Sequence, residues 1–153
     1  MNITTAKTDA ELRQILALQK KNLPQSLSPD QQTDQGFVSA DHSLETLQAM
    51  GHSAAHIIAK DGEIVAGYAL AMTREYSKAV PLLTGIFEFQ DTLLYQGKTL
   101  DKHDYIVMGQ VCVDENYRGQ QLVDKMYAHY RTVHSTRWPL LVTAISPRNT
   151  RSI

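Results

Sequence analysis

Residues 111–123 read Val-Cys-Val-Asp-Glu-Asn-Tyr-Arg-Gly-Gln-Gln-Leu-Val. This stretch begins as an apolar β-type run, turns through a polar corner into Arg118-Gly119, and continues into an amphipathic helical pattern. A strand that passes directly into a helix points the first unpaired N–H groups of the helix, and the positive end of its dipole, at the corner between them. The sequence therefore predicts an anion site at this corner, of a kind that a pyrophosphate fits.

The elements on either side follow from the same patterns, which predict a strand over residues 105–113, a helix over residues 119–134 and a second strand over residues 138–145. The apolar residues of this helix are expected to face the core: Leu122, Val123, Met126, Tyr127, Tyr130 and Val133. A strand–helix–strand crossover places its two strands parallel in one sheet. Gly109 lies inside the first of these strands, where a glycine marks either a β-bulge or a tolerated small residue. The sequence alone does not choose between these two interpretations.

The first part of the chain alternates between helical and strand patterns. Thr8 and Glu11 have the spacing of a capping box, which predicts the start of a helix that Pro24 ends. Asp61-Gly62 joins two apolar runs and is the two-residue signal for a tight antiparallel hairpin. The order predicts a mixed α/β fold in one domain over residues 1–153. The other predicted elements are a strand over 2–5, a polar loop over 24–38, a helix from about Ser43 to Gly51, strands over 54–60 and 63–72, and a helix from about Pro81 to Gln96.

The composition is that of a globular domain, because 153 residues with 42% hydrophobic content can bury a substantial core. No segment approaches the roughly 20 apolar residues that span a bilayer, and Met1–Thr4 lacks the order of a secretory signal. We therefore expect a cytoplasmic protein that contacts no membrane. The single cysteine, Cys112, excludes an internal disulfide and a cysteine-based zinc cluster but leaves catalysis by its thiol open. The six histidines have no paired metal-ligand spacing, so no metal is predicted.

The charge of the chain is unevenly distributed. The formal net charge is −1, yet residues 118–153 carry six Lys and Arg against one acid, Asp124, so this part is +5 and the first 117 residues are −6. A basic third that begins at the predicted anion site suits a ligand with several phosphates. Ordinary solvated surface charge explains the same pattern equally well. A nucleic-acid partner is not expected, because the basic residues are neither dense nor interleaved with aromatic residues.

The corner also carries a family motif. Residues 118–123 resemble the acyl-CoA-binding motif of the GNAT superfamily of N-acetyltransferases, Gln/Arg-x-x-Gly-x-Gly/Ala. The pattern begins here at Arg118, and Gln121 and Val123 fill the two positions where the family has small residues. The order of predicted elements resembles the GNAT fold up to its fifth strand. The resemblance implies a mixed sheet with antiparallel N-terminal strands, a parallel and splayed pair over residues 105–113 and 138–145, and flanking helices.

The resemblance further implies acetyl-CoA as the co-substrate. Its pantetheine arm is expected to pair with the strand edge at residues 111–113. Without the motif that follows, these residues would be read as core strand, and the adjoining Arg118-Gly119 favours the binding role. The backbone N–H groups of the corner are expected to hold the pyrophosphate, with Arg118 near the adenosine. Asn149 matches an asparagine that follows the fifth strand of the family, although a helix N-cap explains it equally well. The candidate cofactor-binding residues are Val111, Cys112, Val113, Arg118, Gly119, Gln120, Gln121, Leu122, Val123 and Asn149.

The implied reaction is direct attack of a neutral primary amine on the acetyl thioester. The candidates for removing the proton of the amine are Tyr105 and, through an ordered water, Gln110, and the N–H of Val111 is the natural donor to the developing oxyanion. The sequence favours the alternative for Tyr105, an aromatic residue of the strand. The alternatives are a catalytically silent acyl-CoA-binding or regulatory module and a structural interaction domain.

The acceptor is expected to be a small-molecule or peptide amine. The loop over residues 24–40 and the helix near Phe87 are expected to wall its side of the cleft, and the acids Asp30, Asp34 and Glu88 hint at a cationic amine. The resembled family continues after the fifth strand into a helix with a frequent tyrosine acid and into further strands, and this chain stops at Ile153. An uncovered edge at residues 140–142 would invite a second copy, so a homodimer or a marginally stable chain is predicted.

Overall fold

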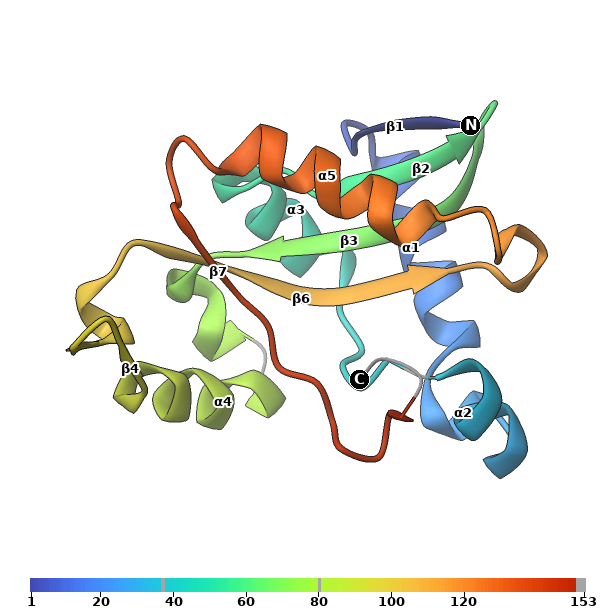
Figure 1. Cartoon of the computed structure of the whole chain (residues 1–153). Helices are drawn as coiled ribbons and strands as arrows, with labels where there is room; N and C mark the ends of the chain where they lie inside the picture. The colour runs from blue at the N-terminus through green and yellow to red at the C-terminus, as the bar shows by residue number, and fades with distance from the viewer. Residues whose placement is uncertain (37, 80, 151–153) are drawn as a thin grey trace.

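Figure 1 shows a computed structural model of the chain, which describes residues 1–36, 38–79 and 81–150. In these residues the main sheet has the strand order β1-β2-β3-β6-β7. Neighbouring strands in it are antiparallel except β6 and β7, which are parallel. This arrangement confirms the predicted mixed α/β class. The strands are β1 (Asn2–Thr5), β2 (Ile57–Asp61), β3 (Ile64–Met72), β6 (Tyr105–Val113) and β7 (Leu140–Val142).

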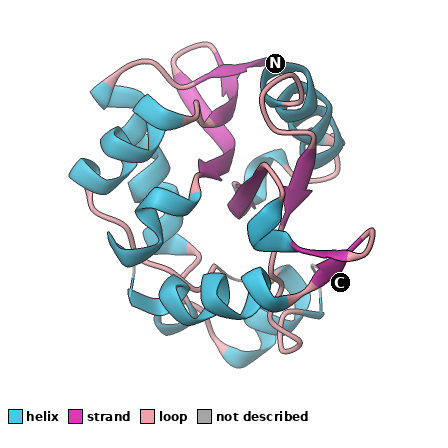
Figure 2. Cartoon of the chain, turned by 90° about the vertical axis from the view of Figure 1, so that its left-hand side faces the viewer, coloured by secondary structure: helices cyan, strands magenta, loops and turns pink. Residues whose placement is uncertain are grey.

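Helices cover both faces of this sheet (Figures 1 and 2). On one face, α1 (Asp9–Lys21), α3 (Leu44–Ser53) and α4 (Pro81–Thr92) contribute Ile15, Leu47 and Phe87 to a buried core. On the other face, α5 (Leu122–His134) buries Leu122, Met126 and Tyr130 against the sheet. The spacing of four residues along α5 explains this, because it keeps all three side chains on one side of the helix.

The start of α1 follows the predicted capping box. The hydroxyl of Thr8 accepts the N–H of Glu11 at 3.2 Å, and the carboxylate of Glu11 accepts the N–H of Thr8 at 3.1 Å. The same carboxylate lies 2.8 Å from the ammonium of Lys60 on β2. Burial alone would raise the pKa of Glu11, but hydrogen bonds from Lys60 and from backbone N–H groups outweigh it and lower the pKa to about 2. One side chain thus caps the helix and joins it to the sheet.

The predicted hairpin forms between β2 and β3, with its turn one residue later than predicted. Asp61 pairs with Ile64, so Gly62 and Glu63 are the turn residues and Asp61 ends the strand. Gly62 has φ of +56°, a conformation that glycine adopts without steric cost.

Two of the predicted boundaries are wrong. A capping box starts a helix inside the first segment, and a tight hairpin follows an earlier helix end in the second. Residues 24–38 are not only loop: Ser28 and Gln31 form a second capping box, which starts a short helix with proline in its first turn. The helix predicted to reach Gln96 ends at Thr92, and Gln96-Gly97, both at positive φ, turn a small hairpin. The short elements are η1 (Pro24–Ser26), α2 (Pro29–Gln35), η2 (Arg74–Ala79), β4 (Leu94–Tyr95), β5 (Lys98–Thr99), η3 (Leu100–Lys102) and η4 (Glu115–Tyr117).

A β-bulge interrupts β6 at Gly109 and Gln110. Ala69 pairs with Val111 and Ala71 pairs with Met108, so β6 has one residue more than β3 between these pairs. A methyl group on Gly109 would make only an ordinary contact, 3.7 Å from Met72, so close packing is not the reason for the glycine. The bulge interpretation of Gly109 therefore holds. Because a bulge reverses the alternation of side chains, Gln110 and Cys112 face the α1 side of the sheet and Val111 faces the α5 side.

Pairing between β6 and β7 stops early. The parallel register runs from Tyr105–Leu140 to Val107–Val142, and the hydroxyl of Thr143 then donates to the carbonyl of Met108 at 3.0 Å. After that point the chain leaves the sheet, as the dark red segment in Figure 1 shows. The strand predicted over residues 138–145 is therefore only Leu140–Val142. The two parallel strands splay apart at the bulge, as the resemblance implied.

The outer edge of β7 has no partner strand among the described residues. Leu141 on this edge is exposed. The homodimer predicted from an uncovered edge stays a prediction.

The helix α5 begins at Leu122, three residues later than predicted. Gly119 has φ of +78°, and Gln121, the residue before the helix, has φ of 57° and ψ of 30°. Two left-handed residues so close together cannot belong to a right-handed helix, so the corner is a tight turn. Gln121 stands where the resembled motif has glycine, and its side chain strains the backbone by about 1–2 kcal/mol.

His56 is a buried histidine held neutral by two backbone groups. Its Nδ1 accepts the N–H of Ala71 at 3.1 Å, so the proton is on Nε2, which donates to the carbonyl of Leu47 at 3.0 Å. Burial lowers the pKa of His56 to about 4; the bond to Leu47 opposes this shift, and the nearby His42 and His134 add to it. The unfolded chain therefore binds this proton more readily than the folded one.

We predict that the protein loses stability as the pH falls from 6.5 to 4. The pKa of His56 is depressed on folding, so its contribution is present above pH 6.5 and is lost as the pH falls through the folded value, by up to about 3 kcal/mol. Urea denaturation at pH 7.5, 6 and 5 measures this. His56→Gln should flatten the pH dependence, whereas the exposed His52→Gln should keep it. A free energy of unfolding that is constant over this range would contradict the prediction.

We also predict that Gln121→Gly stabilises the chain. Relief of the left-handed backbone, about 1–2 kcal/mol, exceeds the about 0.5–1 kcal/mol of conformational entropy that a glycine adds to the unfolded state. The free energy of unfolding from urea denaturation should rise by roughly 0.5–1 kcal/mol. Gln120→Gly is the matched control and should lower it, because Gln120 does not have positive φ. Equal destabilisation by both variants would refute the assignment of strain to Gln121.

Candidate functional site

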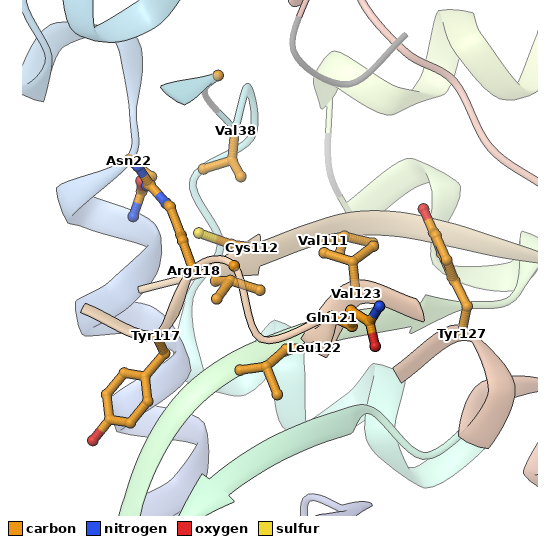
Figure 3. A pocket seen from close by; sticks show the side chains of 13 residues that line it. Asn22, Val38, Val111, Cys112, Tyr117, Arg118, Gln121, Leu122, Val123 and Tyr127 are labelled. Carbon is orange, nitrogen blue, oxygen red and sulfur yellow. The ribbon is translucent and has the colours of Figure 1, made fainter. Parts of the chain in front are cut away.

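A cleft opens where the chain leaves β6. It contains two adjoining cavities of about 460 and 510 Å³, which share Val38, Val111 and Tyr127. The first lies between the end of β6, the start of α5 and the segment after α1 (Figure 3). The second lies in the splay between β6 and the segment over residues 143–149, with α4 as a further wall. The loop before Ala40 and the helix near Phe87 both line the second cavity, where the sequence placed the acceptor side.

The first cavity gathers most of the predicted cofactor-binding residues. Gln120 is not among its lining residues, and Asn149 lines the second cavity instead. The predicted residues in the first cavity are Val111, Cys112, Val113, Arg118, Gly119, Gln121, Leu122 and Val123.

The corner between β6 and α5 presents unpaired backbone donors. Between Gly119 and Asp124 no backbone N–H has a hydrogen-bond acceptor in the described part of the chain, and Lys125 is the first to donate, to the carbonyl of Gln121 at 3.1 Å. These donors stand at the positive end of the α5 dipole. Arg118 lines the same cavity and extends toward Asn22 in Figure 3. None of the described lining residues of this cavity is Asp or Glu. The corner is built to attract an anion.

The edge of β6 beyond the bulge is open toward the splay. Asp114, just after the strand, donates its N–H to Ala66 on β3 at 2.8 Å. Backbone groups alternate between the two edges of a strand, so Cys112 also points to β3, whereas Val111 and Val113 point to the opposite edge. Because β7 pairs no further than Val107, this edge offers N–H and C=O groups to an extended ligand.

The thiol of Cys112 is unreactive at neutral pH. Burial raises the pKa of Cys112 to about 12; Arg118 opposes this shift and Asp114 adds to it. Because the thiolate is the nucleophile, a buried thiol of this kind is a packing group. The structure therefore gives no support to catalysis by this cysteine, which the sequence left open.

Gln110 lines the second cavity, and its amide is bonded to the surrounding fold. The predicted relay through a bound water stays a prediction. The Oε1 of Gln110 accepts from Nε2 of Gln19 at 2.8 Å and from the hydroxyl of Tyr68 at 3.2 Å, and its Nε2 donates to the carbonyl of Ala40 at 2.6 Å. Gln19 in turn accepts the N–H of His42 at 2.9 Å. Gln110 therefore holds α1 and the segment before α3 against the bulge of β6.

Tyr105, predicted as a candidate catalytic base, lies outside the described lining of both cavities. Its hydroxyl donates to the carboxylate of Asp91 on α4 at 2.8 Å, and Arg74 pairs with the same carboxylate and lies over the tyrosine ring. Burial, reinforced by Asp91, raises the pKa of Tyr105 to about 12. The alternative reading, a strand aromatic residue, is the one that the structure supports, because this side chain joins β6 to α4.

Tyr127 is a residue of the cleft that the sequence patterns misplaced. The helical spacing predicted it in the core together with Val123, but Tyr127 is 43% exposed and lines both cavities (Figure 3). Leu122, Met126 and Tyr130 fill the core, so Val123 and Tyr127, each one residue later, lie about 100° further around the helix. Burial, with a contribution from Asp124, raises the pKa of Tyr127, so the phenol is protonated at neutral pH.

Asn149 is buried in the wall of the second cavity, and its N–H donates to the carbonyl of Ser146 at 2.9 Å. Its alternative reading as a helix N-cap depends on residues 151–153, which lie outside the described residues. Among the described residues, no group of three His, Cys, Asp or Glu side chains is arranged to hold a metal ion. The same residues contain no helix that is long and apolar enough to cross a membrane.

Comparisons with known proteins identify the fold. No family model and no curated protein sequence matches the chain. Among solved structures, aminoglycoside N-acetyltransferase AAC(6')-Iy in complex with CoA aligns at 15% identity over 99% of this chain and 84% of that one, with a TM-score of 0.59. Ribosomal-protein-alanine N-acetyltransferase from Brucella melitensis aligns at 17% identity over 99% and 78%, with a TM-score of 0.59. The GNAT family N-acetyltransferase YhbS from Escherichia coli, in complex with CoA, aligns at 18% identity over 95% and 63%, with a TM-score of 0.54. The chain has the GNAT acetyltransferase fold.

Proposed function

We propose that the protein is an acetyl-CoA-dependent N-acetyltransferase that transfers the acetyl group directly to a primary amine. The observation that supports this most strongly is the open edge of β6, which runs from the second cavity along Val111 to Val113 and ends at the unpaired N–H groups of the corner. Two of the structures with a similar fold were crystallised with CoA.

In this proposal, CoA lies along that edge. The diphosphate binds the N–H groups after Arg118, where the dipole of α5 and the guanidinium both favour negative charge. The two amides of the pantetheine pair with the backbone of Val111 and Val113 as an added strand. The adenosine end points to a third hollow of about 550 Å³, whose lining includes Lys20, Lys21 and Arg118. The thioester then reaches the second cavity.

The reaction forms a C–N bond and breaks a C–S bond. The amine attacks the thioester carbon, and the N–H of Val111 donates to the oxygen as negative charge develops on it. The phenol of Tyr127, which lines both cavities, gives its proton to the departing thiolate. The proton of the amine passes to water, because no carboxylate or imidazole lies among the described lining residues of the second cavity.

The lack of a carboxylate or imidazole among the described lining residues of the second cavity also favours a second candidate, a catalytically silent acyl-CoA-binding or regulatory module. Tyr127 is the one ionisable side chain among the described lining residues of the second cavity. A binding module needs the corner and the open edge but no proton-transfer group. A cytoplasmic location and a homodimer stay predictions under either candidate.

Two measurements separate these candidates. Isothermal titration with acetyl-CoA tests binding, and release of CoA thiol in the presence of a panel of primary amines tests transfer. Binding with transfer supports the enzyme, and binding without transfer to any amine supports the module. Failure to bind acetyl-CoA at micromolar concentration would exclude both.

Arg118→Ala should weaken acetyl-CoA binding about tenfold, because a charge-assisted hydrogen bond contributes about 1.5–3 kcal/mol and part of it is lost to solvent. The dissociation constant from titration measures this, and the affinity of the unchanged protein should fall with added salt. Arg131→Ala is the matched control, since Arg131 is an exposed arginine at the other end of α5. An equal loss in both variants would show that general positive charge, and not the corner, binds the ligand.

Tyr127→Phe should lower kcat by about 100-fold, within the range for loss of a general acid. The dissociation constant for acetyl-CoA should stay within about twofold, because the aromatic ring that packs in the cavity is kept. Rapid-quench and steady-state thiol release measure kcat. The control is Tyr95→Phe, which changes an exposed tyrosine on β4, distant in sequence from Tyr127. It should leave kcat unaltered. A Tyr127→Phe enzyme with normal kcat would remove Tyr127 from the reaction.

A further inference from the structure

We infer that the second cavity receives an amine carried on an uncharged, largely apolar body, and that Gln90 positions its N–H group. This inference rests on the proposed function and names the class of acceptor that the site takes. It follows from the charge of the cavity walls, from the position of the acids in the fold and from one buried amide.

The described lining of the second cavity contains no Asp, Glu, Lys, Arg or His. The first cavity differs, because it holds Arg118 beside the helix dipole. The apolar walls of the second cavity come from three directions: the segment before α3, one side of α4, and the strands with the chain that leaves them. These residues are Val38, Ala40, Ile86, Phe87, Val107, Met108, Val111, Ala144 and Ile145.

The acids that hinted at a cationic acceptor lie elsewhere. Asp30, Asp34 and Glu88 are exposed and are absent from the described lining of the cavity. Asp91, further along α4, is already paired with Arg74 and with the hydroxyl of Tyr105. None of the residues outside the described ranges is Asp or Glu in sequence. A second ammonium group in this cavity would therefore be buried without a carboxylate partner, which is strongly unfavourable.

Gln90 contributes a hydrogen-bond acceptor without a donor to the wall of the cavity. Its side chain is on α4, lines the cavity and is only 4% exposed. Its Oε1 is buried, and no donor among the described residues reaches it. A buried carbonyl oxygen without a donor destabilises the protein until an N–H group reaches it. The amine of a bound acceptor supplies one such N–H, and the apolar walls then contact the rest of the molecule.

Hexylamine and 1,6-diaminohexane form a matched pair for the test, because they differ only in the second ammonium. Each is titrated by isothermal calorimetry into protein saturated with CoA, and each is assayed for CoA release from acetyl-CoA. We expect hexylamine to be favoured at least tenfold in dissociation constant and in kcat/KM. Equal or better use of the diamine would overturn the inference, and so would failure of hexylamine to bind.

Variants of Gln90 test the positioning role. Gln90→Met keeps the size but removes the acceptor, so KM for hexylamine should rise about tenfold while the dissociation constant for acetyl-CoA stays unchanged. Gln90→Glu supplies a carboxylate and should reverse the preference toward the diamine. Glu88→Gln, an exposed change on the same helix, should leave the ratio unaltered. A preference that is the same in Gln90→Glu as in the unchanged protein would overturn the role of Gln90.

These readouts keep the inference and the proposed function apart. Selective binding of hexylamine with no CoA release supports the class of ligand and removes the enzyme activity. Transfer to the diamine in preference to hexylamine supports the enzyme and removes the inferred class.

Discussion

The cleft exists because pairing between β6 and β7 ends after Val107. A sheet that stayed paired would use the backbone groups of Val111 and Val113 internally and would leave no second cavity. The bulge at Gly109 and Gln110 coincides with the splay, and the buried amide of Gln110 fixes it by bonds to Gln19, Tyr68 and Ala40. A buried amide with every polar atom satisfied specifies one geometry, so the cleft is held open by the fold itself.

The cleft divides its chemistry between two ends. At the corner, Gly119 and Gln121 adopt left-handed conformations. The helix α5 therefore cannot begin before Leu122, and its first N–H groups face the cavity. At the other end the walls are uncharged, and Gln90 is the buried polar group whose oxygen has no donor among the described residues. An anion is attracted to one end and a largely apolar molecule fits the other. Tyr127 lies between them and lines both.

Local patterns in the sequence predicted what local chemistry determines. The capping box at Thr8, the hairpin at Gly62 and strand β6 all formed close to where they were predicted. The patterns failed where partners distant in sequence decide the outcome. The hydroxyl of Tyr105 bonds to Asp91, and the amide of Gln110 bonds to α1 and to Ala40; no local pattern predicts these partners. Tyr127 was misplaced because a hydrophobic stripe on a helix is wide, and its rim can face a cavity as easily as the core.

Amide hydrogen exchange with and without acetyl-CoA, followed residue by residue in NMR spectra, shows whether the ligand occupies the open edge of β6. The N–H groups of Val111 and Val113 point to the open edge, whereas the N–H of Cys112, between them, points to β3. Saturating acetyl-CoA should slow exchange at Val111, Val113 and residues 119–122 and leave the rate at Cys112 unchanged. Unchanged exchange at Val111 and Val113, or equal slowing at all three strand residues, would contradict the account.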